Sequence, residues 1–292
     1  MGAQIEGRPV VVTGGANGIG AALAAEAAAR GASAVVIADV NADAAQATAA
    51  AIPNATAAVC DVSDAAAVEA FAESVVAEHG VPGLVCANAG VMAGTVPLLD
   101  VDPNDAAWIL GVNALGVFHT LQSFGRRTRD DEVGGWLMAT GSEHSCGVPH
   151  SFASPYTASK HAVLGMCDVL RTELPDHVGV SVLCPGLTTS QLWNAAAQRP
   201  DEFGGAVEGD PAAGGFMEAS GMAASTVAER ALAGAEAGNF LIPTHYNARR
   251  YAEARAADMA AAFDHLGTID TTDYDVNTLA ADLLAQLEAG DT

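Results

Sequence analysis

Short apolar runs alternate with longer alanine-rich stretches along most of this 292-residue chain. The runs lack the polar alternation of half-exposed strands, so they predict strands buried on both faces of a parallel sheet. The expected strands cover residues 10–12, 34–37, 57–59, 83–86, 136–139, 180–183 and 240–242. The stretches between them predict a helix ending near Arg30 and helices at about 42–51, 65–79, 105–124, 156–174 and 226–237. The pattern predicts one α/β domain, a doubly wound parallel sheet with helices on both faces.

One segment, residues 188–221, departs from this alternation. It is long and contains stretches rich in glycine and proline, which predicts a structureless insert that closes over a substrate as a lid. Its apolar side chains favour a bulky, apolar substrate. The candidate substrate contacts are Leu192, Trp193 and Phe203.

The C-terminal residues also fall outside the alternation. Two further helices are expected there, at about 248–265 and 278–288. These helices are expected to pack on the domain or to form an oligomer contact, and the alternative is that they close over the substrate site. We therefore expect the main domain over residues 1–245, with 246–292 as a helical extension of the same domain.

The charge balance excludes several classes of protein. Lysine and arginine total 12 against 35 acidic residues, which gives a formal net charge of −23. Nucleic acids and anionic membranes both require clustered bases, so neither is expected as a partner. The charge reflects a deficit of bases rather than an acidic binding surface, and Lys160 is the only lysine.

Cysteine spacing and hydropathy predict the compartment. The five cysteines include no C-x-x-C pair, which argues against a disulfide framework and a zinc site. Residues 1–8 lack the basic and apolar regions of a secretory signal. Glycines and prolines interrupt the longest apolar run, 80–99, which we interpret as a buried strand and a loop. A cytoplasmic protein with no metal is expected.

A glycine-rich turn follows the first predicted strand and leads into the first helix. Glycines let the backbone approach a phosphate closely, and a helix N-terminus offers N–H groups to it. The spacing is T-G-x-x-x-G-x-G, which differs from the G-x-G-x-x-G of most dinucleotide-binding folds. Cofactor contacts are expected from Thr13, Gly14, Asn17, Gly18, Ile19 and Gly20.

Acidic residues end the next two predicted strands. Asp39 follows the last glycine of the turn by 19 residues, where a carboxylate can accept both ribose hydroxyls and repel a 2′-phosphate. No lysine or arginine lies between Arg30 and Arg126, so nothing nearby in the chain would neutralise that phosphate. NAD is therefore favoured over NADP. Asp61, which precedes Val62, can accept a hydrogen bond from the adenine amino group.

Tyr156 and Lys160 are four residues apart on a predicted helix, so they share one face of it. An ammonium group favours a neighbouring phenolate, and Lys160 is expected to lower the pKa of Tyr156 from its usual value near 10. A tyrosine with such a pKa can act as a general acid and base near neutrality.

Together these motifs resemble the main Tyr-x-x-x-Lys branch of the short-chain dehydrogenase/reductase family, over about residues 8–245. The likeness also includes Asn88-Ala89-Gly90, Asn113, Ser142 and Pro185-Gly186. It implies a Rossmann-like fold and hydride transfer between NAD and a small-molecule alcohol or ketone. Members often form homotetramers through the helices near Asn113 and Tyr156, so a homo-oligomer is expected, with a tetramer favoured over a dimer.

The resemblance implies a role for each matching residue. Tyr156 would exchange a proton with the substrate oxygen, and Ser142 would hydrogen-bond that oxygen. Lys160 would also hold the nicotinamide ribose, and Asn113 would position a water that links Lys160 to solvent. Further cofactor contacts are implied for Asn88, Ala89, Gly90, Pro185, Gly186, Thr188 and Ser190. Most members have an apolar residue in place of Thr188 and threonine in place of Ser190.

Three histidines flank this cluster. His144 and His150 lie between Ser142 and Tyr156, and His161 follows Lys160, where it should point elsewhere on the helix. An exposed loop histidine is the default interpretation of His144, and a substrate contact is the alternative. No cysteine or carboxylate stands at metal-ligand spacing from them.

We expect an NAD-dependent oxidoreductase that interconverts a bulky, apolar secondary alcohol and its ketone, either aryl, alicyclic or terpenoid. Two other classes stay open. A non-catalytic dinucleotide-binding regulator could keep the fold, although it would be expected to lose the serine, tyrosine or lysine. Lyase or epimerase chemistry could also use the same scaffold.

Overall fold

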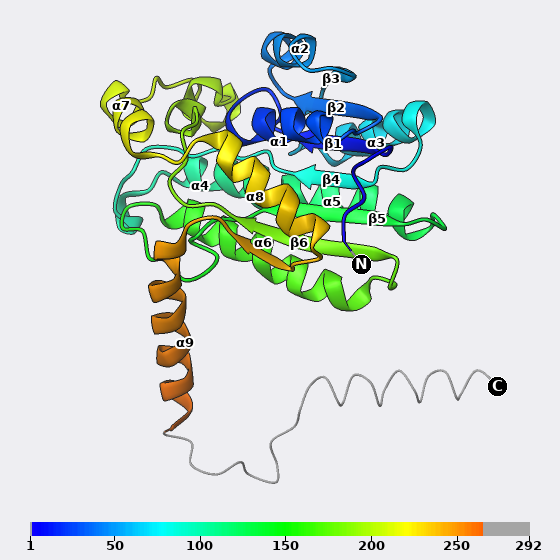
Figure 1. Cartoon of the computed structure of the whole chain (residues 1–292). Helices are drawn as coiled ribbons and strands as arrows, with labels where there is room; N and C mark the ends of the chain where they lie inside the picture. Colours follow the sequence, from blue (N-terminus) through cyan, green and yellow to red (C-terminus); the bar gives the residue numbers. More distant parts are fainter. Residues whose placement is uncertain (1, 265–292) are drawn as a thin grey trace, which may run out of the picture. The chain divides into compact units, whose positions relative to one another are not determined.

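The computed structural model describes residues 2–264 of the chain. These residues form one parallel sheet of seven strands in the order β3-β2-β1-β4-β5-β6-β7 (Figure 1). The chain runs outward from β1 to β3 and then returns to place β4 on the other side of β1. Ligands of doubly wound folds bind at such a reversal, outside the carboxyl ends of the strands. The strands are β1 (Pro9–Thr13), β2 (Ala34–Asp39), β3 (Ala55–Val59), β4 (Leu84–Ala87), β5 (Gly135–Thr140), β6 (Val178–Cys184) and β7 (Leu241–Pro243).

Two apolar layers cover the sheet, as the uniformly apolar strands predict. Successive side chains of a strand point to opposite faces. Val10 and Val12 of β1 accordingly pack with α1 (Gly18–Ala29) and α8 (Ala224–Glu236), while Val11 packs on the other face. The second layer is built from α3 (Ala65–His79), α5 (Gly116–Arg129) and α6 (Ser154–Glu173). The predicted fold class is therefore confirmed.

The helix predicted over 105–124 is divided. In its place, α4 (Pro103–Leu110) leads into a π-helical turn, Gly111–Leu115, and then into α5. A π turn widens the backbone locally and commonly marks a functional site. It carries Asn113, whose side chain is completely buried. The π turn is only five residues long, too short for its wider period to be recognised in the sequence, which is why the sequence predicts a single helix.

The insert at 188–221 is not structureless, and that expectation is wrong. It contains the short helices η3 (Leu192–Gln198) and η4 (Asp201–Phe203) and the longer α7 (Pro211–Ser220). Trp193 supplies a local core, because a Cβ at Gly214 would lie 2.7 Å from its Cε2 atom. A segment rich in glycine can therefore fold around one indole ring.

The predicted tail begins with α9 (Arg249–Phe263), close to the helix expected at 248–265. The second expected helix, at 278–288, lies outside the described residues. Contacts divide the chain into one unit of residues 1–251 and a second of residues 252–292. From residue 2 to residue 264, no helix is both long and apolar enough to cross a membrane.

Phe124 tests the second apolar layer. Its ring is completely buried and packs edge-on against Phe71, with centroids 5.7 Å apart. We expect Phe124→Ala to lower the free energy of unfolding by about 3–5 kcal/mol, since it removes a buried ring and leaves a cavity. The measurement is urea denaturation. Phe216→Ala, at a side chain that is 60% exposed, is the control and should change stability by less than about 1 kcal/mol; equal effects would contradict the assignment of this core.

Candidate active site

The glycine turn between β1 and α1 is built for close approach by a ligand. Gly14 and Gly18 have φ angles of +61° and +53°, which other residues rarely adopt. A Cβ at Gly20 would lie only 2.0 Å from the Gly14 carbonyl oxygen. In the described part of the chain, the Asn17 side chain makes no capping hydrogen bond to α1. The N–H groups at this helix end are therefore left for an anionic group.

Asp39 lies beside the glycine turn. Its Oδ2 accepts a hydrogen bond from the Ala16 backbone N–H at 3.1 Å, and its Oδ1 accepts one from Asn41 at 3.0 Å. The carboxylate is thereby held at the end of β2, where the sequence predicts the adenosine ribose. Asp61 is exposed and accepts two hydrogen bonds from Ser63. The following Val62 is buried near Gly116 of α5.

Asn88 ties three strand ends together. Its amide nitrogen donates to the carbonyl oxygens of Thr13 and Gly14 at 3.1 and 3.2 Å, and its amide oxygen accepts from the Thr140 hydroxyl at 3.1 Å. The Thr13 hydroxyl accepts the Asn88 backbone N–H at 3.0 Å. Ala89 lies against Gly14, whose Cβ would be 2.6 Å from the Ala89 Cα. The Asn-Ala-Gly motif therefore fixes the glycine turn to the centre of the sheet.

Tyr156 and Lys160 lie on the first turns of α6, as expected. Lys160 is 2% exposed, and its ammonium donates to the Thr140 carbonyl oxygen at 2.8 Å. Its Nζ lies 5.5 Å from the centroid of the Tyr156 ring. A Cβ at Gly90 would be 3.5 Å from both Lys160 Nζ and the Asn113 amide oxygen. The sequence-predicted residues of three segments thus meet around Gly90.

Asn113 is fully engaged by its neighbours. Its amide oxygen accepts the Val91 N–H at 2.7 Å, and its amide nitrogen donates to the Val91 carbonyl at 2.9 Å and to the Ser159 hydroxyl at 3.2 Å. The π turn aims this side chain at the loop after β4. Asn113 therefore joins α6 to the wall of the site.

Burial sets the ionisation of the central pair. It raises the pKa of Tyr156 to about 12, an effect that a hydrogen bond with Ser142 opposes and the charge of Glu143 increases. Burial also lowers the pKa of Lys160 to about 8. The expectation that Lys160 lowers the pKa of Tyr156 is not met, because desolvation outweighs the other influences and the ammonium is bonded to Thr140.

His144 is buried, and its default interpretation as an exposed loop residue is wrong. Its Nδ1 lies 2.7 Å from the Thr157 hydroxyl, and its ring stacks on His150 with centroids 4.4 Å apart. It also meets the Tyr156 ring edge-on at 5.2 Å. Burial, followed by the nearby bases, lowers the pKa of His144 to about 3. His161 instead bonds to the Thr157 carbonyl on its own helix.

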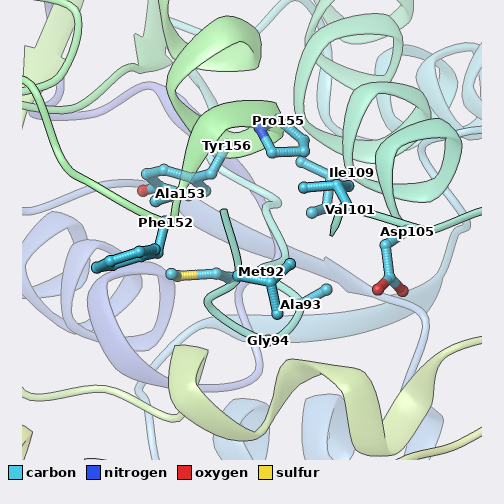
Figure 2. A pocket seen from close by; sticks show the side chains of 11 residues that line it. Met92, Ala93, Gly94, Val101, Asp105, Ile109, Phe152, Ala153, Pro155 and Tyr156 are labelled. Carbon is cyan, nitrogen blue, oxygen red and sulfur yellow. The ribbon is translucent and has the colours of Figure 1, made fainter. Parts of the chain in front are cut away.

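An apolar pocket adjoins Tyr156 (Figure 2). The pocket is shallow: its empty space of about 280 Å³ includes the solvent at its open side. The loop after β4, α4 and the start of α6 supply its walls. Its lining residues are Met92, Ala93, Gly94, Val96, Val101, Asp105, Ile109, Phe152, Ala153, Pro155 and Tyr156. Of these eleven residues, the sequence predicts only Tyr156. The apolar run after Asn88-Ala89-Gly90 is a signal for four of the others, Met92, Ala93, Gly94 and Val96.

Phe152 is the strained residue of this pocket. Its φ is +68°, uncommon for a bulky side chain, and its carbonyl accepts the Val96 N–H at 3.1 Å. The residue is 54% exposed and lines the pocket. The strain places an aromatic surface beside the space that Tyr156 faces.

The predicted lid residues Leu192, Trp193 and Phe203 are not among those that line this pocket. Trp193 is used in packing against α7. The insert reaches the pocket instead through Arg199, which forms an ion pair with Asp105 on the pocket wall. Arg199 also donates to the Gly205 carbonyl at 2.8 Å.

The loop after β6 brings the last predicted residues to the site. The Thr188 hydroxyl donates to the Gly186 carbonyl at 2.9 Å, and the Thr188 side chain is buried. Ser190 lies against the glycine turn, since a Cβ at Gly18 would be 3.1 Å from the Ser190 Cβ. Among residues 2–264, no group of three histidine, cysteine or acidic side chains could hold a metal ion.

Comparison with known proteins identifies the family. Residues 8–201 match the short chain dehydrogenase family, so the chain belongs to this family of oxidoreductases, in its Tyr-x-x-x-Lys branch. A short-chain dehydrogenase/reductase from Burkholderia phymatum, solved in complex with NAD, is 28% identical. It superimposes with a TM-score of 0.80 over 93% of this chain and 99% of that one.

Two curated relatives show how far the likeness extends. (+)-Borneol dehydrogenase 1 from Salvia officinalis is 31% identical over 183 residues, 62% of this chain and 69% of the relative. The probable oxidoreductase EphD of Mycobacterium tuberculosis is 40% identical over 136 residues, 46% of this chain. That match spans only 22% of EphD, so the chain is similar to one part of a much longer protein.

The low pKa of His144 predicts how stability depends on pH. Between about pH 6.5 and 3 the unfolded chain binds a proton on this histidine and the folded chain does not. The contribution of His144 to the free energy of unfolding is therefore fully present above the pKa of the unfolded chain, and it falls as the pH is lowered. From pH 7 to pH 5, we expect His144 to account for a loss of about 1–2 kcal/mol.

Urea unfolding at the two pH values measures this loss. His144→Gln should flatten the dependence by that amount, whereas His177→Gln, at a half-buried histidine that bonds to the Arg129 carbonyl, is the control and should flatten it less. An unaltered slope in His144→Gln would contradict the assigned pKa.

Proposed function

We propose that this protein is an NAD-dependent oxidoreductase that interconverts a secondary alcohol and a ketone. One observation carries the proposal: Tyr156 lines an apolar pocket close to Ser142, while Lys160 lies buried behind its ring. A positioned phenol beside an apolar pocket is suited to proton exchange with an alcohol oxygen. When bound, NAD would supply the hydride acceptor.

The residues present fit that cofactor. The glycine turn leaves backbone N–H groups for the pyrophosphate, and Asp39 lies beside it for the ribose hydroxyls. We propose that Asp61 and Val62 border the adenine, and that Thr188 and Ser190 contact the nicotinamide. The Asn-Ala-Gly segment and Pro185-Gly186 would complete the site between these two ends.

The protein groups would divide the proton chemistry among them. Ser142 holds the substrate oxygen beside Tyr156, and Tyr156 exchanges the proton with it. Lys160 provides positive charge next to the phenol and holds the nicotinamide ribose. Asn113 braces the loop after β4 and would position a water that links Lys160 to solvent.

The substrate is proposed to be bulky and apolar. Methionine, valine, isoleucine, proline and phenylalanine side chains line the pocket beside Tyr156, and such a surface favours an aryl or alicyclic body. (+)-Borneol dehydrogenase 1, whose name gives an alicyclic alcohol, is among the similar proteins. We also propose that His144 borders the substrate, because its buried ring meets Tyr156 edge-on. The insert 188–221 would act as the lid over it.

The assembly and compartment are part of the same proposal. We expect a cytoplasmic homo-oligomer, with a tetramer favoured. The exposed apolar side chains Leu115 and Phe118, at and near the start of α5, support such a contact. The five cysteines are free, which agrees with a reducing compartment.

Replacement of Tyr156 by phenylalanine tests the chemistry. We expect Tyr156→Phe to lower kcat by a factor of at least about 100, because the hydroxyl that exchanges the proton is lost. NADH absorbance, followed over a panel of cyclic and aryl secondary alcohols, is the measurement. NAD affinity, measured by calorimetry, should change little. Full turnover in this variant would refute the proposed mechanism.

The same assay separates the alternatives. NAD binding with no turnover over the panel would favour a dinucleotide-binding regulator. Turnover of a substrate without transfer of label from deuterated cofactor would favour lyase or epimerase chemistry.

Asp39 should determine the choice of cofactor. We expect the protein to bind NAD at least about tenfold more tightly than NADP, since a carboxylate at this place repels a 2′-phosphate. Asp39→Asn removes the charge and keeps an acceptor for one backbone N–H. It should therefore reduce the preference for NAD over NADP, mainly by improving NADP binding. Titration calorimetry with both cofactors measures this. Tighter binding of NADP by the wild type would contradict the prediction.

A further inference from the structure

His245 holds the backbone that follows β6. The Gly186 N–H donates to its Nδ1 at 3.0 Å, and its Nε2 lies 3.0 Å from the Leu187 carbonyl oxygen. A backbone N–H can only donate, so Nδ1 is an acceptor and the ring proton is on Nε2. One flat ring therefore accepts from one residue of the loop and donates to the next.

The contact requires a glycine at position 186. A Cβ there would lie 2.7 Å from His245 Cγ and 2.8 Å from a carboxylate oxygen of Glu143. The Glu143 N–H also donates to the Pro185 carbonyl at 2.8 Å. The Pro-Gly motif thus lies between the histidine on one side and the segment that carries Ser142 on the other.

The imidazole of His245 is itself held in place through the preceding residue, Thr244. Thr244 is 2% exposed, and its hydroxyl lies 2.8 Å from His245 Nδ1. The Thr244 N–H donates to the Cys184 carbonyl at 3.3 Å, and its carbonyl accepts from the guanidinium of Arg230. The position of the ring is therefore set by β6 and α8 and not by the loop that it holds.

A second attachment holds the far side of the same loop. Met222 donates to the Leu187 carbonyl at 3.0 Å, and Thr189 donates to the Met222 carbonyl at 2.9 Å. The Leu187 carbonyl accordingly accepts from both Met222 and His245. Beyond this point Ser190 reaches Gly18 of the glycine turn. The loop is therefore fixed between the catalytic segment and the phosphate-binding segment.

We propose that His245 is a positioning residue for the nicotinamide end of the cofactor, acting through the backbone of Gly186 and Leu187. This rests on the proposed NAD-binding function. His245 stands outside residues 8–201, the part of the chain that matches the family. It holds the start of the loop whose next residues, Thr188 to Ser190, face the site.

Two ligands distinguish positioning of the nicotinamide from a general structural role of His245. NAD contains the nicotinamide, and ADP-ribose has the same adenine, pyrophosphate and riboses without it. We expect His245→Phe, which keeps a flat ring and loses both polar contacts to the loop as well as the one to Thr244, to raise the Kd of NAD about tenfold in calorimetry, since two hydrogen bonds to the loop are lost. The Kd of ADP-ribose should change less than about twofold.

Two further variants complete the test. His245→Asn restores an acceptor for Gly186 but not the donor to Leu187, so its Kd for NAD should be intermediate. His177→Phe is the matched control: His177 also bonds to a backbone carbonyl, that of Arg129 at 3.1 Å, and packs on Gly134, but before the start of β6. It should leave both Kd values unchanged. Circular dichroism melting verifies that each variant is folded.

The outcomes are distinct. An unchanged Kd for NAD in His245→Phe would overturn the proposal. Equal weakening of NAD and ADP-ribose would also overturn it, because the histidine would then support the fold rather than the nicotinamide loop. If the wild type binds neither ligand, the proposed function itself fails, and this inference fails with it.

Discussion

The amide of Asn88 is the interaction on which the site depends. It joins the end of β1 to β5, because it donates to Thr13 and Gly14 and accepts from Thr140. Thr140 in turn gives its carbonyl to the ammonium of Lys160. A single run of hydrogen bonds therefore extends from the glycine turn, across the point where the chain reverses direction, to the buried lysine.

Desolvation is the second constraint on the site. It raises the pKa of Tyr156 and lowers those of Lys160 and His144, so each group is driven toward its neutral form. The pocket beside them is lined mainly by apolar side chains, and its one carboxylate, Asp105, is paired with Arg199. The surroundings therefore suit an uncharged reactant, which agrees with an alcohol and ketone pair.

Much of the fold could be predicted from sequence because the strands are uniformly apolar and glycines or acids end them. The glycine turn, Asn88, Asn113 and the Tyr-x-x-x-Lys pair could be found because their spacing is local and characteristic. The π turn could not, since five residues are too few for its wider period to be recognised between two helices. The burial of His144 depends on stacking with His150, and the contacts of His245 depend on strand order. Neither has a signature along the chain.

The single lysine also has a chemical consequence. The other eleven bases are arginines, and Lys160 is 2% exposed. Most soluble proteins present many lysine amines to acylating reagents, and modification then falls mainly on their surface. Here the only lysine ε-amine lies inside the site, with a pKa near 8. Acetylation or any other acyl transfer to a lysine of this chain could therefore take place only at its candidate catalytic centre. Because Lys160 is buried, the folded protein protects its amine from acylating reagents.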